Sequence, residues 1–319
     1  MSLRNLEGHD DFDITWPWER DDRLRRGATA VLRVKDEAAN LPFVLPPLLR
    51  CTDAVLLVDN GSTDGTAEVA IETARSLGLG ERLTVRDYPF AVARAGAEHL
   101  EVHERSVHSL SYFYNWAFAQ VTTAYSWKWD GDMVLTREGE LSLRDLGWQV
   151  GREPVVVRMP RHGLFLPDPL EDDRRGWLDL GWRNREEWGF PTGPDFVYAK
   201  AFEWEIRRTP AQVRRVALPD LLCVELKHLA GDEFAHWTDP ASFADPAGSW
   251  RTQRKRREWE VFHALREGEV PEGVLEVTAP DGVHVVDHVV RTVLPAMKRV
   301  TQGTYRSGSR AEDAPVTLR

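Results

Sequence analysis

The chain contains 319 residues, of which 42% are hydrophobic, so it is long enough for one large α/β domain or two smaller ones. Its formal net charge of −10 argues against a general nucleic-acid-binding surface, because such a surface needs a local basic patch. The two cysteines, Cys51 and Cys223, lie far apart in apolar surroundings, which argues against a disulfide scaffold or zinc ribbon and fits a reducing interior.

Membrane and secretion signals are not expected in this chain. Residues 1–13 are polar and acidic and lack the apolar segment of a signal peptide. The most apolar late stretch, residues 283–300, is interrupted by Asp287, His288 and Arg291, so it cannot span a bilayer. We therefore expect a soluble, cytoplasmic protein with no transmembrane segment.

Apolar runs and helical periodicity alternate through the first half of the chain, after a charged arm over residues 1–27. A helix should begin near Asp36, where Pro42, Pro46 and Pro47 are expected to keep it short or irregular. The other predicted elements are strands at 28–35, 54–58, 83–86 and 125–129 and helices at 67–77 and 107–120. Alternation of this kind indicates a parallel, doubly wound sheet.

The second half of the chain is less regular. Residues 163–194 form an excursion rich in Trp, Asp, Arg and Gly that is too long to be a passive connection. An amphipathic helix at 283–298 could support a homodimer or pack on the protein's own sheet. The other predicted elements are a strand at 155–161, a strand or strand pair at 196–207, a strand at 221–229, a basic helix at 249–266 and a short strand or turn at 274–279.

Carboxylates follow three of the predicted strands: Asp36 and Glu37 the first, Asp59 the second, and Asp130 and Asp132 the fourth. Ligands of open parallel sheets bind at the carboxyl ends of the strands. Positions two apart on a strand point the same way, so both acids of the Asp-Gly-Asp segment can reach one volume. Paired oxygens suit Mg²⁺ or Mn²⁺, with a substrate's phosphates completing the shell. Asp-Gly-Asp alone also forms ordinary turns, so the convergence of three acidic ends indicates the nucleotide–metal site.

Three segments, taken in order, resemble the opening of family 2 glycosyltransferases of the GT-A fold. They are residues 30–41 (Ala-Val-Leu-Arg-Val-Lys-Asp-Glu-Ala-Ala-Asn-Leu), residues 58–66 (Val-Asp-Asn-Gly-Ser-Thr-Asp-Gly-Thr) and residues 130–132 (Asp-Gly-Asp). The resemblance implies an α/β, GT-A type three-layer sandwich with a mixed, mainly parallel central sheet and a C-terminal helical extension. The expected division is an arm at 1–27, a catalytic domain at 28–232 with nucleotide-binding (28–134) and acceptor (135–232) halves, and an extension at 233–319.

The resemblance also implies roles for individual residues of the nucleotide half. Asp59 would hydrogen-bond the base edge, and Asn115 would pack on the nucleotide. Asp130 would lie near the ribose and the metal. The base and ribose pocket would be lined by Arg33, Lys35 and Glu37.

A divalent cation, Mn²⁺ or Mg²⁺, is the cofactor that the resemblance implies. Asp132 would ligate the ion that bridges the donor's diphosphate, with Asp130 beside it. His228, at the end of a predicted buried strand, resembles a histidine that some GT-A enzymes add as a further ligand. A structural role for this histidine is an equal alternative.

The acceptor hydroxyl must lose a proton, and a nearby carboxylate can accept it. Asp195, which precedes a predicted strand, is the first candidate for this base. Glu203 and Glu205 flank Trp204 in that strand, and the excursion supplies four rivals. These rivals are Asp172, Asp173, Asp179 and Glu187.

The function that these features favour is a metal-dependent, inverting transfer of a hexosyl-type sugar from a nucleotide-diphosphate sugar, UDP-sugar or GDP-sugar, to a hydroxyl acceptor. A nucleotidyltransferase acting on a sugar phosphate is a second reading, although residues 33–40 lack the Gly-rich loop of that class. A non-catalytic nucleotide- or sugar-binding module of the same fold is a third. The basic run 251–257 is typical of a solvated helix face, but it could also hold an anionic acceptor or touch a membrane surface.

Overall fold

A seven-stranded sheet forms the centre of the computed structural model, which describes residues 3–20, 23–149, 154–167, 173–182, 186–201, 204–231 and 250–298. The strand order is β12-β6-β9-β4-β1-β2-β3, and β9 is the one strand of this sheet that runs against the others. The strands are β1 (Arg25–Val34), β2 (Ala54–Asp59), β3 (Leu83–Asp87), β4 (Thr123–Asp130), β6 (Val155–Arg158), β9 (Glu187–Pro191) and β12 (Arg214–Ala217). The predicted α/β class with a mixed, mainly parallel central sheet is confirmed.

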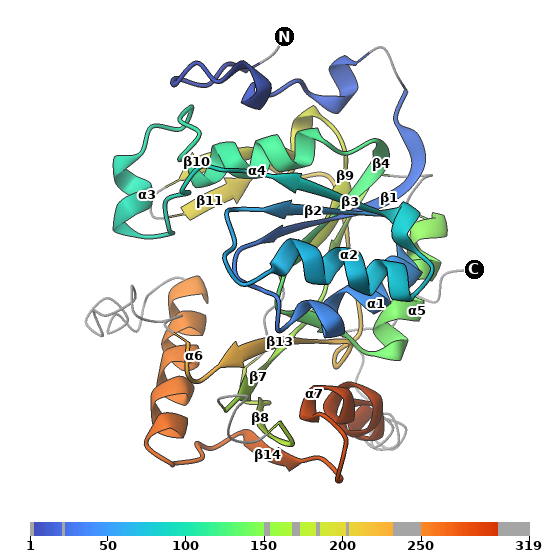
Figure 1. The fold of residues 1–319 in the computed structure, drawn as a ribbon, viewed down its shortest axis with the longest axis vertical. Coiled ribbons are helices and arrows are strands. Elements are labelled where there is room, and N and C mark those ends of the chain that lie inside the picture. Colours follow the sequence, from blue (N-terminus) through green and yellow to red (C-terminus); the bar gives the residue numbers. More distant parts are fainter. Residues whose placement is uncertain are drawn as a thin grey trace.

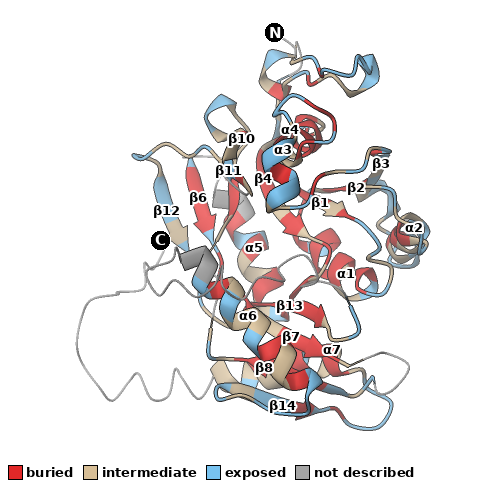
Figure 2. Ribbon diagram, turned by 90° about the vertical axis from the view of Figure 1, so that its left-hand side faces the viewer, coloured by how far each residue is buried: buried red, intermediate tan, exposed pale blue. Residues whose placement is uncertain are grey.

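Both faces of this sheet are buried beneath helices, because successive residues of the apolar strands enter two separate cores. Leu32 packs with α1 (Leu41–Cys51), α2 (Thr66–Ser76) and α5 (Arg137–Gln149), whereas its neighbour Val31 packs with α4 (Leu110–Ala119) on the other face. Figure 1 shows α2 and α4 on opposite sides of the strands, and Figure 2 shows buried residues concentrated along β4, β1 and α1. The result is the predicted three-layer arrangement.

A second, five-stranded sheet of order β14-β8-β7-β13-β5 lies beside the first. Helix α6 (Trp250–Arg266) packs through Phe262 on one face, and α7 (Val285–His288), which continues as a π-helical turn at Val289–Val293, packs on the other. The strands are β5 (Met133–Leu135), β7 (His162–Leu166), β8 (Arg175–Asp179), β13 (Cys223–His228) and β14 (Val274–Thr278). Because β14 pairs with β8, the predicted C-terminal extension shares a sheet with the acceptor half.

Small elements complete the described part of the chain. A hairpin of β10 (Tyr198–Ala201) and β11 (Trp204–Arg207) contacts α4, and the short helix α3 (Ala97–Glu101) lies in the segment that leads into α4. The N-terminal arm, expected to be extended, docks on α4 through 3-10 turns (η1, Asp10–Phe12; η2, Pro17–Glu19), with Ile14 fully buried. The remaining 3-10 turns are η3 (Gly80–Arg82) and η4 (Pro194–Phe196). No described helix is long and apolar enough to cross a membrane.

The structure corrects three local predictions. Helix α1 is continuous despite Pro46 and Pro47, because its apolar face packs in the core and this packing outweighs the two missing amide donors. Helix α5 was not predicted, since Gly139 weakens the helical pattern; a Cβ at that position would lie 2.4 Å from the Leu222 carbonyl oxygen. The excursion at 163–194, for which no strands were predicted, contains most of β7 and all of β8 and β9.

Gly189 provides a test of the sheet packing. It lies opposite Trp127 in the β4–β9 pair, and a Cβ at this position would be 2.5 Å from the indole ring. We expect Gly189→Ala to lower the free energy of unfolding by about 1–3 kcal/mol through overpacking, measured by urea denaturation. Gly193→Ala is the matched control, since its Cβ would have no atom within 4 Å; an equal loss in both variants would contradict the packing argument.

Candidate active site

A cleft of about 420 Å³ opens at the carboxyl ends of β1 and β4, where the sequence predicted the site. Register places Arg33 beside Asp130 and Val34 beside Asp59, so the three strand ends lie next to one another. Seven Lys or Arg and six Asp or Glu side chains line the cleft, although the chain as a whole carries a charge of −10. The cleft therefore has one cation in excess, whereas the chain as a whole is acidic.

Asp130 is held in its ionised form by a fixed guanidinium. Arg33 donates from Nη2 to Asp130 Oδ1 at 2.6 Å, and its guanidinium stacks on the Tyr114 ring, 3.7 Å from the centroid. Burial raises the pKa of Asp130, but Lys128, Arg33 and Arg161 together lower that pKa below its ordinary value. Asp130 is thus a structural anion whose oxygens face cations of the protein itself.

Asp132 has the opposite environment. Burial, followed by the repulsion of Glu225, raises the pKa of Asp132 well above its ordinary value. Its Oδ1 is buried and has no hydrogen-bond partner among the described residues, and the nearest cation, Lys227 Nζ, is 3.8 Å from Oδ2. A buried carboxylate oxygen without a partner is destabilising unless a further cation approaches it.

Gly131 brings these two acids close to the first strand. A Cβ at this position would lie 2.7 Å from Glu37 Cγ and 3.0 Å from Val34 Cγ1, so the turn packs directly against the end of β1. Within the described residues, no three His, Cys, Asp or Glu side chains are grouped to hold an ion. Asp132, with its unpaired oxygen, fits a hard cation whose remaining ligands come from phosphates and water. That chemistry requires one or two carboxylates and no protein cage.

An ion-pair network covers the opposite wall of the cleft. Arg161 Nε lies 2.8 Å from Glu225 Oε2, and Lys227 donates to Glu225 Oε1 at 2.9 Å. Burial raises the pKa of Glu225, but Arg161 and Lys227 outweigh it and lower that pKa far below its usual range. Glu225 and Lys227 are two apart on β13 and therefore face the same side. The network holds two buried cations beside Asp132.

Helix α6 contributes two further cations from the basic run 251–257, for which the sequence allows a solvated face, an anionic acceptor site or a membrane contact. Arg254 is buried, pairs with Glu186 at 2.9 Å and lines the cleft, as does Lys255. Arg256 is exposed and pairs with Glu260 along the helix. The solvated-face interpretation thus holds for Arg256 but not for Arg254, whose cost of burial is offset by its acidic partners.

The predicted nucleotide residues divide into two groups. Arg33, Lys35 and Glu37 line the cleft together with Asp130. Asp59 is the last residue of β2 and lies beside them. Its Oδ1 accepts a hydrogen bond from the Ser62 amide at 2.9 Å, which stabilises the turn that follows the strand. The roles of these residues in nucleotide binding remain predictions.

The predicted position of Asn115 is wrong, because this residue does not line the cleft. It is buried on α4, where its side chain accepts from the Tyr198 amide and donates to the Tyr198 carbonyl, both at 2.8 Å. These two bonds mimic a strand pairing and attach β10 to the helix. Asn115 therefore positions the hairpin and is not among the residues that line the cleft.

The ligand role predicted for His228 is also corrected. Side chains alternate along β13, so His228 faces away from Lys227 and lines a separate cavity of about 110 Å³ with Leu226. Its Nε2 lies 2.8 Å from Asn40 Oδ1, while Asn40 donates to Glu37 at 2.7 Å. Because the amide nitrogen of Asn40 is the donor to Glu37, its oxygen must accept from His228, which leaves Nε2 protonated and not free to bind metal.

The carboxylates predicted as candidates for the general base occupy different environments. Asp195 is exposed in η4 and does not line the cleft, whereas Glu187 is fixed by three guanidinium groups, from Arg158, Arg207 and Arg215. Neither therefore suits a general base. Among the rivals, Asp179 is buried against Arg257, Asp173 lines the cavity of His228, and Glu203 and Asp172 lie outside the described residues.

Glu205, the neighbour of Trp204 in β11, lines the cleft. Tyr114, Arg161 and Glu225 also line the cleft and were not predicted, whereas Arg254 lies in the basic run 251–257 that the sequence offered as a possible anion site. The i, i+2 spacing of Glu225 and Lys227 on a strand and the i, i+4 spacing of Arg254 and Glu258 on a helix were the available signals. The Arg161 and Tyr114 contacts depend on tertiary packing and had no local signal.

No family model matches the chain, and no curated protein matches it. Among solved structures, it is similar to residues 1–349 of TarS from S. aureus in complex with UDP-GlcNAc, at 14% identity over 75% of this chain and 72% of that chain, with a TM-score of 0.41. It is also similar to the mannosyltransferase PcManGT from Pyrobaculum calidifontis in complex with GDP-Man and Mn²⁺, at 15% identity over 92% and 78%, with a TM-score of 0.39. A third similar structure is glucosyl-3-phosphoglycerate synthase from Mycobacterium tuberculosis in complex with Mn²⁺, UDP and glucosyl-3-phosphoglycerate, at 18% identity over 42% of this chain and 44% of that chain, with a TM-score of 0.27.

Glu187 generates a pH-dependent prediction. Burial raises its pKa, but Arg215, Arg207 and Arg158 lower it below 4.5, so this carboxylate stabilises the fold only while it is ionised. We expect Glu187→Gln to lower the free energy of unfolding by about 2–4 kcal/mol at neutral pH. The difference from the wild type should stay constant above pH 4.5 and shrink as the pH falls below it.

Urea denaturation of both proteins between pH 3 and pH 8 measures this difference. Glu72→Gln is the control, because Glu72 pairs with Arg75 on the surface and should contribute little. A difference that grew on acidification would contradict the assigned ion pairs.

Proposed function

We propose that the protein is a glycosyltransferase that uses a nucleotide-diphosphate sugar and a divalent cation. The observation that carries this proposal is the unpartnered buried oxygen of Asp132, facing a cleft with an excess of cations at the carboxyl ends of a parallel sheet. The order of the three motifs resembles family 2 enzymes of the GT-A fold, and UDP-sugar or GDP-sugar is the donor class this resemblance favours. Mn²⁺ or Mg²⁺ bound at Asp132 would neutralise charge that develops on the departing diphosphate.

The chain's own residues supply the rest of the donor site. Lys227 and Arg161, both buried and within the same network as Asp132, offer fixed positive charge to the phosphate oxygens. Arg33 is held by Asp130 and Tyr114, so its planar guanidinium is preorganised on the wall where the resemblance places the base and ribose. These side chains are already ordered, which reduces the entropy lost on binding.

Glu205 is the carboxylate that we propose as the general base for the acceptor hydroxyl. The pKa of Glu225 is lowered far below its usual range, which makes it a weak base, and the carboxylate of Glu186 is already engaged by Arg254 and Lys128. Glu205 is buried in the cleft wall, and no cation within the described residues lies within 4 Å of its carboxylate. A base that removes the hydroxyl proton during direct attack on the sugar would give inversion without a covalent intermediate.

The metal assignment is tested with Asp132→Ala. We expect this variant to lose metal-dependent nucleoside diphosphate binding by about 100-fold or more, since the ligand charge contributes several kcal/mol, while its unfolding temperature without ligand does not fall. Isothermal titration with UDP and with GDP, each with and without Mn²⁺, measures the effect. Asp87→Ala, at the exposed end of β3, is the control and should bind as the wild type does.

Metal-independent binding of equal strength in Asp132→Ala and the wild type would remove Asp132 from the site. Binding without turnover, under any combination of donor and acceptor, would favour the non-catalytic module. Transfer of a nucleotidyl group to a sugar phosphate would favour the nucleotidyltransferase.

The base is tested with Glu205→Gln. We expect donor affinity to be kept and kcat to fall by about 10²–10⁴-fold, because the amide cannot take the hydroxyl proton. Turnover is measured with the donor identified in a panel of nucleotide sugars. Asp195→Asn serves as the control and should leave kcat unchanged; the reverse pattern would return the role to Asp195.

A further inference from the structure

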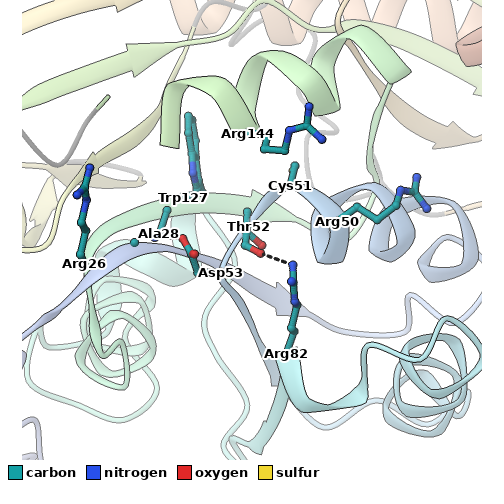
Figure 3. A pocket seen from close by; sticks show the side chains of 10 residues that line it. Arg26, Ala28, Arg50, Cys51, Thr52, Asp53, Arg82, Trp127 and Arg144 are labelled. Carbon is teal, nitrogen blue, oxygen red and sulfur yellow. Dashed lines mark hydrogen bonds between the residues drawn. The ribbon is translucent and has the colours of Figure 1, made fainter. Parts of the chain in front are cut away.

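A cavity of about 390 Å³ opens at the amino ends of β1, β2 and β3, and four arginines line it. Figure 3 shows these side chains apart and pointing in different directions, so they do not surround one ligand. A smaller cavity, of about 110 Å³, lies beside the cleft instead. Asn40 and His228 line this smaller cavity, and Asn40 bonds to Glu37, which lines the cleft. Hydrogen bonds between these three residues therefore connect the small cavity to the candidate active site.

Glu37 is held at the cleft through both its backbone and its side chain. Its amide donates to Thr66 Oγ1 at 2.8 Å, and its carbonyl oxygen accepts from the Asn40 amide at 3.0 Å. The carboxylate Oε2 accepts from Asn40 Nδ2 at 2.7 Å. The Glu37 Cγ packs against Gly131, where an added Cβ would lie 2.7 Å from it. The side chain is therefore fixed by Asn40 on one side and by the Asp-Gly-Asp turn on the other.

His228 decides which end of the Asn40 amide faces Glu37. An asparagine amide has one donor end and one acceptor end, and its nitrogen must face the carboxylate. His228 Nε2 lies 2.8 Å from Asn40 Oδ1, so its N–H keeps the oxygen on the side of the imidazole. The reversed amide would place an acceptor against an acceptor at Glu37 and a donor against a donor at His228. Because Asn40 is buried, water cannot replace these contacts at low cost.

The Glu37 carboxylate acts on the same volume as Asp132. Burial and the repulsion of Glu225 and Glu37 raise the pKa of Asp132, so the charge of Glu37 is felt where the cation is expected. A glutamate without the bond to Asn40 would regain rotamer freedom, and a ligand would have to remove that freedom again on binding. The bond therefore favours binding at the cleft without itself touching the ligand.

We propose that Asn40 is a positioning residue of the donor site, which holds the Glu37 carboxylate in the orientation that the nucleotide sugar meets, and that His228 acts by fixing the amide of Asn40. This inference rests on the proposed function, because the ligand that profits from it is the nucleotide of that proposal. It gives His228 an effect that passes through two hydrogen bonds and not through the metal ion.

Asn40→Asp tests the first hydrogen bond. The change keeps the shape of the side chain and is compatible with the start of α1, since acids are favoured at helix N-termini, but it turns the donor toward Glu37 into an acceptor. We expect the affinity for UDP or GDP in the presence of Mn²⁺ to fall by about 10-fold, as a hydrogen bond to a charged group contributes roughly this factor. Isothermal titration measures the affinity.

A double-mutant cycle shows whether Asn40 acts through Glu37. In the Glu37→Gln background, the new amide at position 37 can donate to the new carboxylate at position 40. Asn40→Asp should therefore cause no further loss of nucleotide affinity in that background. The same 10-fold loss in both backgrounds would mean that Asn40 acts by another route, and would overturn the proposal.

Two substitutions of His228 separate positioning from metal binding. Glutamine can place an N–H where Nε2 lies but is a poor ligand for Mn²⁺, so His228→Gln should keep the wild-type nucleotide affinity. His228→Ala removes the N–H and should lower the affinity by about 10-fold. His103→Ala, at an exposed position outside the cleft, is the control and should bind as the wild type does.

The outcomes distinguish this inference from the function on which it rests. An equal loss in His228→Gln and His228→Ala would overturn the positioning role and return His228 to the metal. Wild-type binding that Asn40→Asp and His228→Ala leave unchanged would overturn the inference alone. A wild-type protein that binds neither UDP nor GDP with Mn²⁺ would overturn the proposed function and this inference together.

Discussion

Burial of charge at the ends of β1 and β4 is the constraint on which the site depends. A carboxylate removed from water must be compensated by cations and hydrogen bonds, or it takes up a proton. Asp130 satisfies this requirement within the protein, through Arg33 and Arg161, and its pKa is lowered. Asp132, two residues away, does not satisfy it, and its pKa is raised. The same Asp-Gly-Asp turn therefore contains one acid that completes the structure and one that awaits a ligand.

The first half of the fold could be predicted from the sequence because its signals are local. Val55 to Val58 form a continuous buried run, and the acids that follow each strand mark the carboxyl edge of a parallel sheet. The second half could not be predicted in the same way. β7, β8 and β9 are short and contain Gly, with Trp in β8 and β9, in place of β-branched residues, and each pairs with a strand far away in the chain. Their positions follow from tertiary packing, as with Gly189, which is required by the Trp127 ring.

The candidate site shows the same division. Asp130 and Asp132 were predicted from the order of the strands in the sequence, and Arg33 from the resemblance of the first motif; all three line the cleft. His228 was misplaced because neighbouring residues on a strand face opposite sides. On β13 it is Lys227 that faces the cleft, and His228 faces the other cavity. Asn115 was misplaced because a buried amide that bonds to backbone has the same sequence signature as one that faces a ligand. Strand alternation decides such cases only when the register is known.

Four of the seven cations that line the cleft come from outside residues 28–134, and this bears on how the two sheets build the site together. Arg161 and Lys227 belong to the second sheet or its approach, and Arg254 to α6, yet all three meet the acids of β4 and its turn in one cleft. An acidic strand edge alone would repel a diphosphate. The second sheet supplies the opposite charge, and antiparallel pairing of β13 with β5, which directly follows the Asp-Gly-Asp turn, fixes that charge beside Asp132. Each half is therefore electrostatically incomplete without the other, so the fold joins them through the same turn that carries the unpartnered carboxylate.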